Sequence, residues 1–215
     1  VFEVSKKTIV ADLVEMEKKS SAIANKSLIK IKIDKGNVEF IISEKTSILE
    51  IRQYFFEQSI AFKLLVVLYQ EHFIKLKTFS LTYYYSPSVV YKKVNELKVK
   101  LKEYGLTIKS EHGSIYLDGE EEKKRYFYSE IFYYVYGDRN SLLDTEKKIA
   151  ENYLKKSKIK SNLIQESKQV RICIFIAVSL QRMKDFPLVK SRLPYFRDSM
   201  AIENKFYSFL EDSYP

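Results

Sequence analysis

The side chains between Ser88 and Lys98 have types and a helical spacing that suit contact with DNA. We expect four of them to face a groove and two to lie nearer the phosphates, namely Ser88, Tyr91, Lys92 and Asn95, and then Lys93 and Lys98. An asparagine amide can form two hydrogen bonds with the edge of adenine, and a lysine ammonium can reach guanine or a phosphate oxygen. These side chains could therefore recognise DNA. A plain surface helix, whose polar side chains only meet water, is equally consistent with this segment alone.

A helix with marked ends must position these side chains. Ser86 is a suitable N-cap, Pro87 fits the first helical position, and Gly105 fits the residue after the last turn. At the α-helical period, one stripe is apolar and consists of Val90, Val94, Leu97 and Leu101. The opposite stripe consists of Ser88, Lys92, Asn95, Val99 and Lys102. The sequence therefore predicts an amphipathic helix over residues 86–104 that packs on a core and keeps its polar face available.

The segments around this helix predict a winged helix-turn-helix. An apolar helix over 60–72 precedes it, followed by a short helix over 79–85 that Thr78 or Ser80 would cap. Alternating apolar residues at 106–117, with a turn at 111–114, predict a β-hairpin after it. The order helix, short helix, turn, polar-faced helix and hairpin is that of a winged helix-turn-helix. Lys109 on this wing is expected to lie over a phosphate.

The same order of helix and hairpin occurs earlier in the chain. Residues 5–19 predict a helix with Ser5 as N-cap, and superposing Ser5 on Ser86 aligns Ile9, Leu13 and Met16 with Val90, Val94 and Leu97. Alternation over 28–42, with a turn at 35–37, predicts a hairpin. Such a repeat favours a module that folds as a unit. By this reasoning two more helices belong before Ser5, so the chain is expected to begin inside a first winged domain.

The first repeat also supplies candidate phosphate contacts, which are Lys6, Lys7, Lys30 and Lys32. The outward stripe of its helix consists of Lys7, Val10, Ala11, Val14 and Lys18. Three of these positions are apolar, and they suit thymine methyl groups or packing against a neighbouring domain equally well. The second repeat is therefore the better candidate reader of sequence.

The rest of the chain predicts helices alone. Helical patterns cover residues 120–136, 142–156, 163–183 and 202–210. The aromatic cluster at 126–136 favours a core or a subunit interface over stacking with bases. The predicted fold is mainly α with small β-hairpin wings: tandem winged helix-turn-helix units followed by an all-α helical bundle. Its domains are 1–45, the C-terminal part of a first winged unit, 46–119, a second unit with a leading linker helix at 47–58, and 120–215, a helical regulation-like domain.

The charge balance favours an acidic partner. The chain has 37 Lys and Arg against 28 Asp and Glu, a formal charge of +9, and residues 75–109 contain eight lysines against two glutamates. The single cysteine, Cys173, lies in an apolar run, which indicates an inert core thiol and a reducing cytoplasm. Apolar runs are too short to cross a bilayer, and no signal-peptide pattern is present. We expect double-stranded promoter DNA as partner, a homo-oligomer, no membrane contact and no small-molecule substrate.

Composition argues against an enzyme. Five glycines provide no phosphate-binding loop, and no nucleophile is paired with a base. Two histidines and one cysteine do not make a zinc site, so we expect no cofactor and no metal. His112 is expected in the turn at the wing tip, and His72 at the C-terminal end of a helix, where the helix dipole favours it.

Three stretches, 86–97, 104–108 and 115–127, resemble the Mga-type virulence and stress regulators. The helix at 5–16 and its hairpin are similar to the first domain of that family. Its chains carry two winged helix-turn-helix domains followed by phosphotransferase-regulation domains, so the resemblance implies a cytoplasmic bacterial transcription regulator that binds promoter DNA. Such regulation domains usually carry phosphorylated histidines. The histidines here, His72 and His112, both precede Gly119, so no phosphohistidine is expected at residues 120–215. Control by that route is then expected either in a second regulation domain beyond Pro215 or to have been lost.

A second function remains compatible with the sequence. The winged units and the helical region could together form a protein-interaction module without direct DNA binding. Binding to a protein partner that persists at high salt would favour this module, because contacts with DNA phosphates weaken as salt rises.

Overall fold

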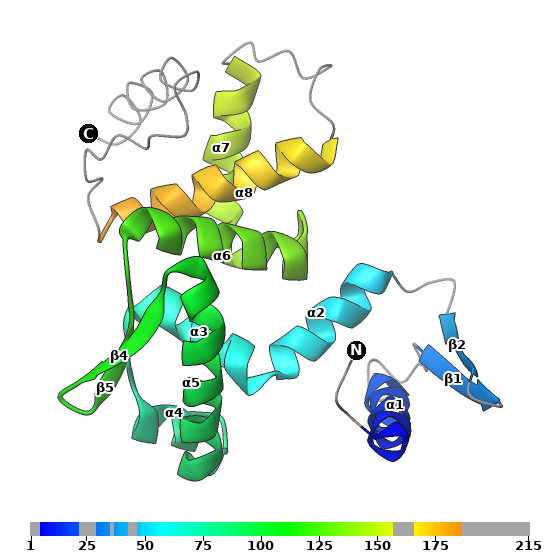
Figure 1. The fold of residues 1–215 in the computed structure, drawn as a ribbon. Helices are drawn as coiled ribbons and strands as arrows, with labels where there is room; N and C mark the ends of the chain where they lie inside the picture. The colour runs from blue at the N-terminus through cyan, green and yellow to red at the C-terminus, as the bar shows by residue number, and fades with distance from the viewer. Residues whose placement is uncertain (1–4, 22–28, 35–36, 43–46, 157–165, 186–215) are drawn as a thin grey trace. The chain divides into compact units, whose positions relative to one another are not determined.

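The computed structural model describes two compact units. The described residues are 5–21, 29–34, 37–42, 47–156 and 166–185. Contacts between residues divide the chain into the units Val1–Ser59 and Ile60–Pro215, and Figure 1 shows their helices and strands. The domain boundaries expected at residues 45 and 119 stay predictions.

The first unit contains a helix, a hairpin and a second helix, which are α1 (Lys6–Ser21), β1 (Ile29–Asp34), β2 (Asn37–Ile42) and α2 (Ile48–Gln58). The N-cap predicted at Ser5 is confirmed, because its Oγ accepts a hydrogen bond from the Thr8 backbone at 3.1 Å. The predicted hairpin is also confirmed: β1 and β2 are antiparallel, with Ile31 opposite Phe40. Of its predicted turn at 35–37, residues 35 and 36 lie outside the described part of the chain.

A small apolar core holds the first unit together. Ile51 of α2 is buried, and Met16, Ile31 and Phe55 pack against it. The carboxylate of Glu17 accepts a hydrogen bond from the Ile31 backbone at 3.2 Å, which ties α1 to β1. The hairpin contributes only part of its apolar face to this core, and the side chains of Ile33, Val38, Phe40 and Ile42 stay exposed.

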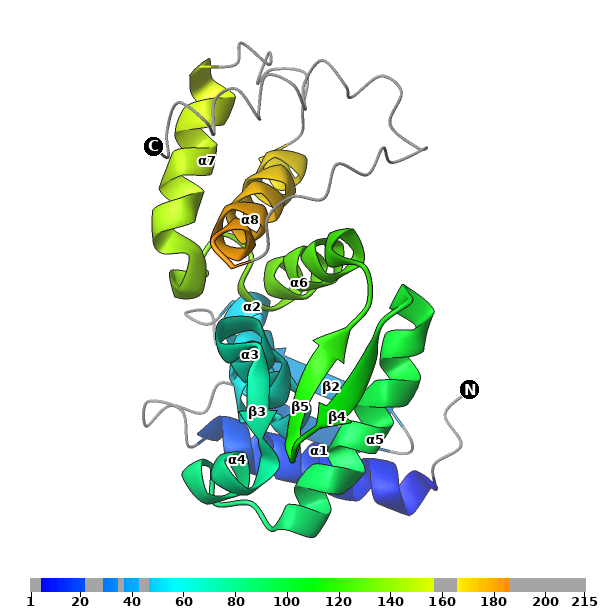
Figure 2. The same ribbon diagram turned by 90° about the vertical axis from the view of Figure 1, so that its left-hand side faces the viewer.

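The second unit begins with the winged helix-turn-helix that the sequence predicts. Its elements are α3 (Ile60–Glu71), β3 (Phe73–Lys75), α4 (Leu76–Thr82), α5 (Pro87–Leu101), the 3₁₀ turn η1 (Lys102–Tyr104), β4 (Thr107–Glu111) and β5 (Ser114–Asp118). The strands form one antiparallel sheet in the order β3-β5-β4 (Figure 2). The predicted fold class, mainly α with small β-hairpins, is confirmed for the described residues.

Two details of this unit correct the prediction. The sequence reasoning missed β3, in which Ile74 is buried opposite Ile115 of β5 while its neighbours are exposed. The short helix begins at Leu76 and not at residue 79, so Thr78 and Ser80 lie inside it and neither caps it. A three-residue strand is too short for its period to be recognised in the sequence. The helix that follows it begins three residues earlier in the chain than predicted.

The described residues after Gly119 form helices, which are α6 (Glu121–Tyr136), the 3₁₀ turn η2 (Ser141–Leu143), α7 (Asp144–Lys156) and α8 (Glu166–Met183). These confirm the patterns predicted at 120–136 and 142–156, with small differences at their ends, and the part of the pattern at 163–183 that begins at residue 166. Residues 163–165 lie outside the described part of the chain. The pattern predicted at 202–210 lies outside the described residues. None of the helices in the described ranges is both long and apolar enough to cross a membrane.

Aromatic side chains of α6 form much of the core of this unit. Phe127, Tyr128 and Phe132 are buried. The centre of the Tyr69 ring of α3 lies 4.8 Å from that of the Tyr128 ring and 4.9 Å from that of the Phe132 ring. The buried residues of the cluster therefore form a core, one of the two alternatives that the helical spacing favoured, whereas Tyr126 and Tyr134 are exposed. Cys173 of α8 is also buried, and burial raises the pKa of its thiol, which agrees with an inert core cysteine.

Candidate nucleic-acid interface

The ends of α5 are set by the residues that the sequence singled out. Ser86 is the N-cap residue in an extended conformation, and its carbonyl accepts the first backbone bond from Val90 at 3.2 Å. Its hydroxyl lies 3.2 Å from that of Ser88 and makes no cap bond. Pro87 occupies the first turn, and the chain leaves η1 through Gly105 at φ 66°, a left-handed conformation that favours glycine.

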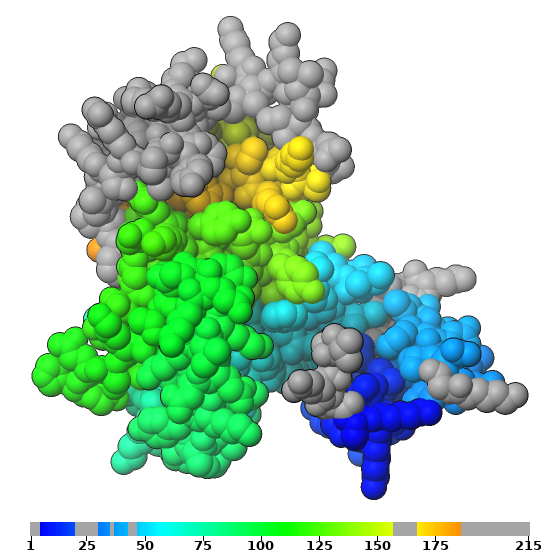
Figure 3. All heavy atoms as spheres, in the orientation of Figure 1, coloured from blue at the N-terminus to red at the C-terminus, as the bar shows by residue number. Residues whose placement is uncertain are grey.

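Burial divides α5 into the two predicted faces. The apolar stripe is buried along the whole helix and consists of Val90, Val94, Leu97 and Leu101. The opposite stripe is exposed and consists of Ser88, Lys92, Asn95, Val99 and Lys102. In the space-filling view, α5 forms part of the outer surface of its unit (Figure 3). The core thus fixes the helix while leaving a row of polar groups in solvent.

Three of the predicted groove-facing side chains are available for new bonds. Tyr91, Lys92 and Asn95 are exposed, and none of them makes a hydrogen bond or ion pair with another described residue. Lys98, predicted nearer the phosphates, is half-buried. An exposed amide, ammonium and phenol on one helix can exchange water for base edges or phosphates at little cost to the fold.

Two predicted phosphate contacts already have acidic partners. Lys93 Nζ lies 2.7 Å from Glu96 Oε2 on α5, and Lys109 Nζ lies 2.8 Å from Asp118 Oδ2 across the wing. The hydrogen bond from Lys93 lowers the pKa of Glu96, and the bond between Lys109 and Asp118 raises the pKa of the lysine and lowers that of the aspartate. Ion pairs exposed to this degree are weak, so a phosphate can replace the carboxylate.

The predicted contacts of the first unit lie on its surface. Lys6 and Lys7 are exposed at the start of α1, and Lys30 and Lys32 are exposed on β1, where Lys32 stands opposite Glu39. These positions are compatible with phosphate contacts, and their role stays a prediction.

The packed face of α1 differs from the predicted one. Ile9 is exposed, whereas Val10 is half-buried together with Leu13, Met16 and Glu17. The face is rotated by about one residue, because Glu17 bonds to β1 and draws its own side of the helix inward. Of the apolar residues predicted to point outward, Ala11 and Val14 therefore do so and Val10 does not.

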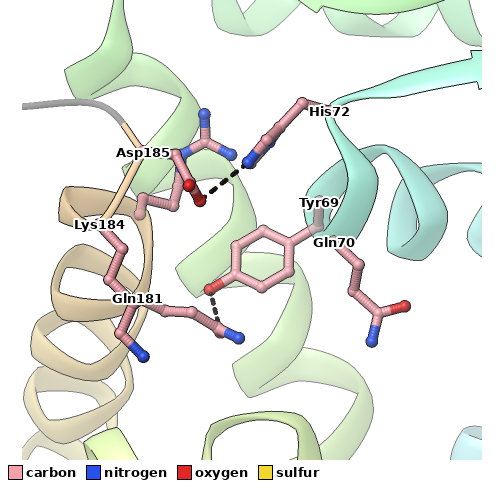
Figure 4. A pocket seen from close by; sticks show the side chains of 7 residues that line it. Tyr69, Gln70, His72, Gln181, Lys184 and Asp185 are labelled. Carbon is pink, nitrogen blue, oxygen red and sulfur yellow. Dashed lines mark hydrogen bonds and ion pairs between the residues drawn. The ribbon is translucent and has the colours of Figure 1, made fainter.

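A small polar pocket lies between the ends of α3 and α8 in the second unit (Figure 4). The Tyr69 hydroxyl donates to Gln181 Oε1 at 2.7 Å, and His72 Nε2 lies 3.1 Å from Asp185 Oδ2. His72 follows the last residue of α3, as predicted, at φ 62°. The volume of about 150 Å³ suits a few water molecules, and its lining forms pairs that hold α3 and α8 together.

Other residue clusters in the described ranges provide no metal site. No group of three or more His, Cys, Asp or Glu among these residues could hold a metal ion. His112 lies in the turn between β4 and β5 at φ 48°, with its side chain exposed, as predicted for a wing tip. The sequence analysis did not name the turn at residues 83–85 or Lys63 beside it as candidate functional residues. The one signal that could have found them is the order helix, turn, helix.

Comparison with protein families agrees with this geometry. Residues 44–132 match the family model of the Mga helix-turn-helix domain. A search of curated proteins found no match. The matched region starts before α2 and ends within α6, so it includes α5 and its wing. It indicates a DNA-binding regulator with a helix-turn-helix domain of the Mga kind.

Proposed function

We propose that this chain is a sequence-specific transcription regulator of the Mga type that binds double-stranded promoter DNA. The observation that carries the proposal is the division of α5 into a buried apolar face and an exposed face with unengaged Lys92 and Asn95. Its place in a helix-turn-helix that matches the Mga domain supports the same function. We infer no catalytic activity and no cofactor.

In this proposal α5 enters the major groove, where the N-terminal part of a recognition helix comes closest to the bases. Asn95 forms two hydrogen bonds with an adenine, and Lys92 reaches guanine or a phosphate. Lys109 exchanges Asp118 for a phosphate and so fixes the position of the wing without reading sequence.

In this proposal the first unit is also part of a winged helix-turn-helix, and it contacts DNA in addition to the second unit. Its support is the repeated order of helix and hairpin, with the lysines Lys6, Lys7, Lys30 and Lys32 on the surface. The helices after Gly119 form a region similar to phosphotransferase-regulation domains, and the protein acts as a homo-oligomer on promoter DNA in the bacterial cytoplasm, in the control of virulence. These finer features rest on the resemblance to the Mga family.

The test compares Lys92→Ala and Asn95→Ala with the wild type by fluorescence anisotropy on curved and A·T-rich promoter fragments at several salt concentrations. Lys92→Ala should weaken binding. A lost phosphate contact would weaken it equally on all fragments and reduce the salt slope by about 1, whereas a lost guanine contact would weaken it only on fragments that carry that base. Asn95→Ala should reduce discrimination between fragments by roughly 1–3 kcal/mol, because an amide that pairs with a base is lost.

A matched control separates a contact from a general loss of charge. Lys148 is exposed on α7, and Lys148→Ala removes the same charge far along the chain from α5. Equal effects of Lys92→Ala and Lys148→Ala would mean that only net charge matters. A wild-type protein that binds no fragment, but holds a protein partner at high salt, would contradict the proposal and favour an interaction module.

A further inference from the structure

The turn between α4 and α5 contains a tyrosine in a conformation that ordinarily belongs to glycine. Tyr84 has φ 57° and is 95% exposed. Its backbone N–H donates to Leu81 O at 3.4 Å, and the N–H of Tyr85 donates to Ser80 O at 3.0 Å. This pair of bonds is the Schellman motif, in which the left-handed position is usually glycine because a Cβ there is strained.

The fold holds this turn through the neighbours of Tyr84. The Tyr83 ring lies 4.6 Å from the Phe79 ring, and Lys63 Nζ donates to the Tyr85 hydroxyl at 3.1 Å. The same ammonium lies 5.6 Å from the centre of the Tyr83 ring and 5.5 Å from that of Tyr85. The two flanking tyrosines therefore stabilise the turn.

The Tyr84 side chain contributes nothing comparable to the fold. It makes no hydrogen bond or ring contact with any other residue in the described ranges, and its ring stands in solvent. A strained residue whose side chain does not stabilise the structure points to a role in binding.

The location of the turn indicates what Tyr84 contacts. In a helix-turn-helix on DNA, the first helix crosses the sugar-phosphate backbone and the second enters the major groove by its N-terminal part. The turn that joins them therefore lies at the edge of the groove, beside the phosphates. Tyr84 is separated from the N-cap of α5, Ser86, by one residue. Tyrosine hydroxyls are among the groups that contact DNA phosphates.

We propose that Tyr84 is a DNA-backbone contact, whose hydroxyl donates a hydrogen bond to a phosphate at the edge of the groove that α5 enters. This inference rests on the proposed function and adds a positioning residue to it. The contact fixes the orientation of α5 and carries no sequence information, so it strengthens binding to every sequence equally.

Two variants of the full chain test the contact, with a mixed-sequence DNA duplex as the probe. Tyr84→Gly should unfold at the same or a higher temperature, because relief of the left-handed strain offsets the greater freedom of glycine in the unfolded chain. It should bind the duplex roughly tenfold more weakly, because a hydrogen bond to a charged group is lost. Tyr84→Phe should weaken binding similarly. Neither variant should change the salt slope, since a neutral hydroxyl displaces no counterion.

The controls distinguish this inference from the function on which it rests. Tyr126→Phe removes a hydroxyl from an exposed tyrosine on α6 and should bind DNA like the wild type. If Lys92→Ala weakens binding while both Tyr84 variants bind normally, the inference is wrong, the proposed function stands, and Tyr84 is free to serve a protein partner. If the wild type binds no duplex, both fail.

Discussion

Two lysines on the helix-turn-helix unit already contact a carboxylate in the absence of DNA. Lys93 is paired with Glu96, and Lys109 with Asp118, at half-buried or exposed positions. Pairs of this kind are weak because water and salt screen them. Binding of DNA through them would be an exchange of one anion for another, so they should add less affinity than Lys92, which has no ion pair among the described residues.

A glycine at the end of the wing allows a prediction about stability. Gly119 has φ 137°, and a Cβ on it would lie 2.6 Å from Leu106 Cδ2 and 3.1 Å from the Gly105 carbonyl oxygen. Gly119→Ala should therefore lower the free energy of unfolding by about 2–4 kcal/mol, from backbone strain together with the clash. Urea denaturation followed by circular dichroism measures this change.

Gly113→Ala is the matched control for this variant. Gly113 lies at the wing tip with φ 78°, and a Cβ there would meet no atom within 4 Å. Gly113→Ala should lower the free energy of unfolding by about 1–2 kcal/mol, from backbone strain alone. Equal losses for the two variants would show that the contact with Leu106 relaxes easily and that the clash is unimportant.

At the scale of an element, α5 separates stability from recognition on its two faces. Val94 is 3% exposed and Val99 is 68% exposed on the same helix. Val94→Ala should lower the free energy of unfolding by about 2–3 kcal/mol, because it removes buried methyl groups and leaves a cavity. Val99→Ala should change it by less than about 0.5 kcal/mol. Both substitutions raise helix propensity equally, so the difference reports burial alone.

Thermal unfolding and duplex binding measured together check this division. At a temperature where it is folded, Val94→Ala should bind DNA as the wild type does, since its side chain faces the core. A large loss of DNA affinity in folded Val94→Ala, with Val99→Ala unaffected, would contradict the separation of the two faces.

At the scale of the second unit, one carboxylate joins several helices. Glu121, in the first turn of α6, accepts hydrogen bonds from Arg182 Nε at 2.7 Å, Arg182 Nη2 at 2.8 Å and Arg125 Nε at 3.0 Å. The guanidinium of Arg182 also lies 5.9 Å from the centre of the Tyr69 ring of α3. The end of α8 is thus held to α6 by a bidentate ion pair and to α3 by a cation–π contact.

This ion pair makes stability depend on pH. Burial alone would raise the pKa of Glu121, but the hydrogen bonds and charges of Arg182 and Arg125 outweigh it and lower that pKa. A carboxyl whose pKa is lower in the folded state stabilises the protein above its unfolded pKa, about 4.3 for glutamate. The stabilisation should disappear as the pH falls through the folded value.

Glu121→Gln tests this dependence in a series of urea denaturations from neutral to acidic pH. The variant should lose about 3–5 kcal/mol at neutral pH, because Arg182, 4% exposed, loses its carboxylate partner. It should also show a smaller further loss in acid than the wild type. The ordinary pKa of glutamate is about 4.3. If the variant and the wild type lose the same stability below that pH, other carboxylates cause the acid sensitivity.

The sequence by itself determined the features that depend on neighbours along the chain. The period of apolar residues gave the two faces of α5, and the alternation of apolar residues gave both hairpins. Capping residues such as Ser5, whose Oγ accepts from Thr8 N at 3.1 Å, marked helix ends. These signals are local, because side chains three or four residues apart in a helix, and two apart in a strand, share a face.

Only the tertiary structure decided the features that depend on distant partners. β3 exists because β5 supplies its hydrogen bonds, and the packed face of α1 follows from the bond between Glu17 and β1. The pairing of Lys109 with Asp118 depends on the register of the wing. The left-handed backbone conformation of Tyr84 depends on a turn that its neighbours stabilise. Each is set by contacts between segments far apart in sequence or by a backbone conformation that residue type does not favour, so no local period could reveal it.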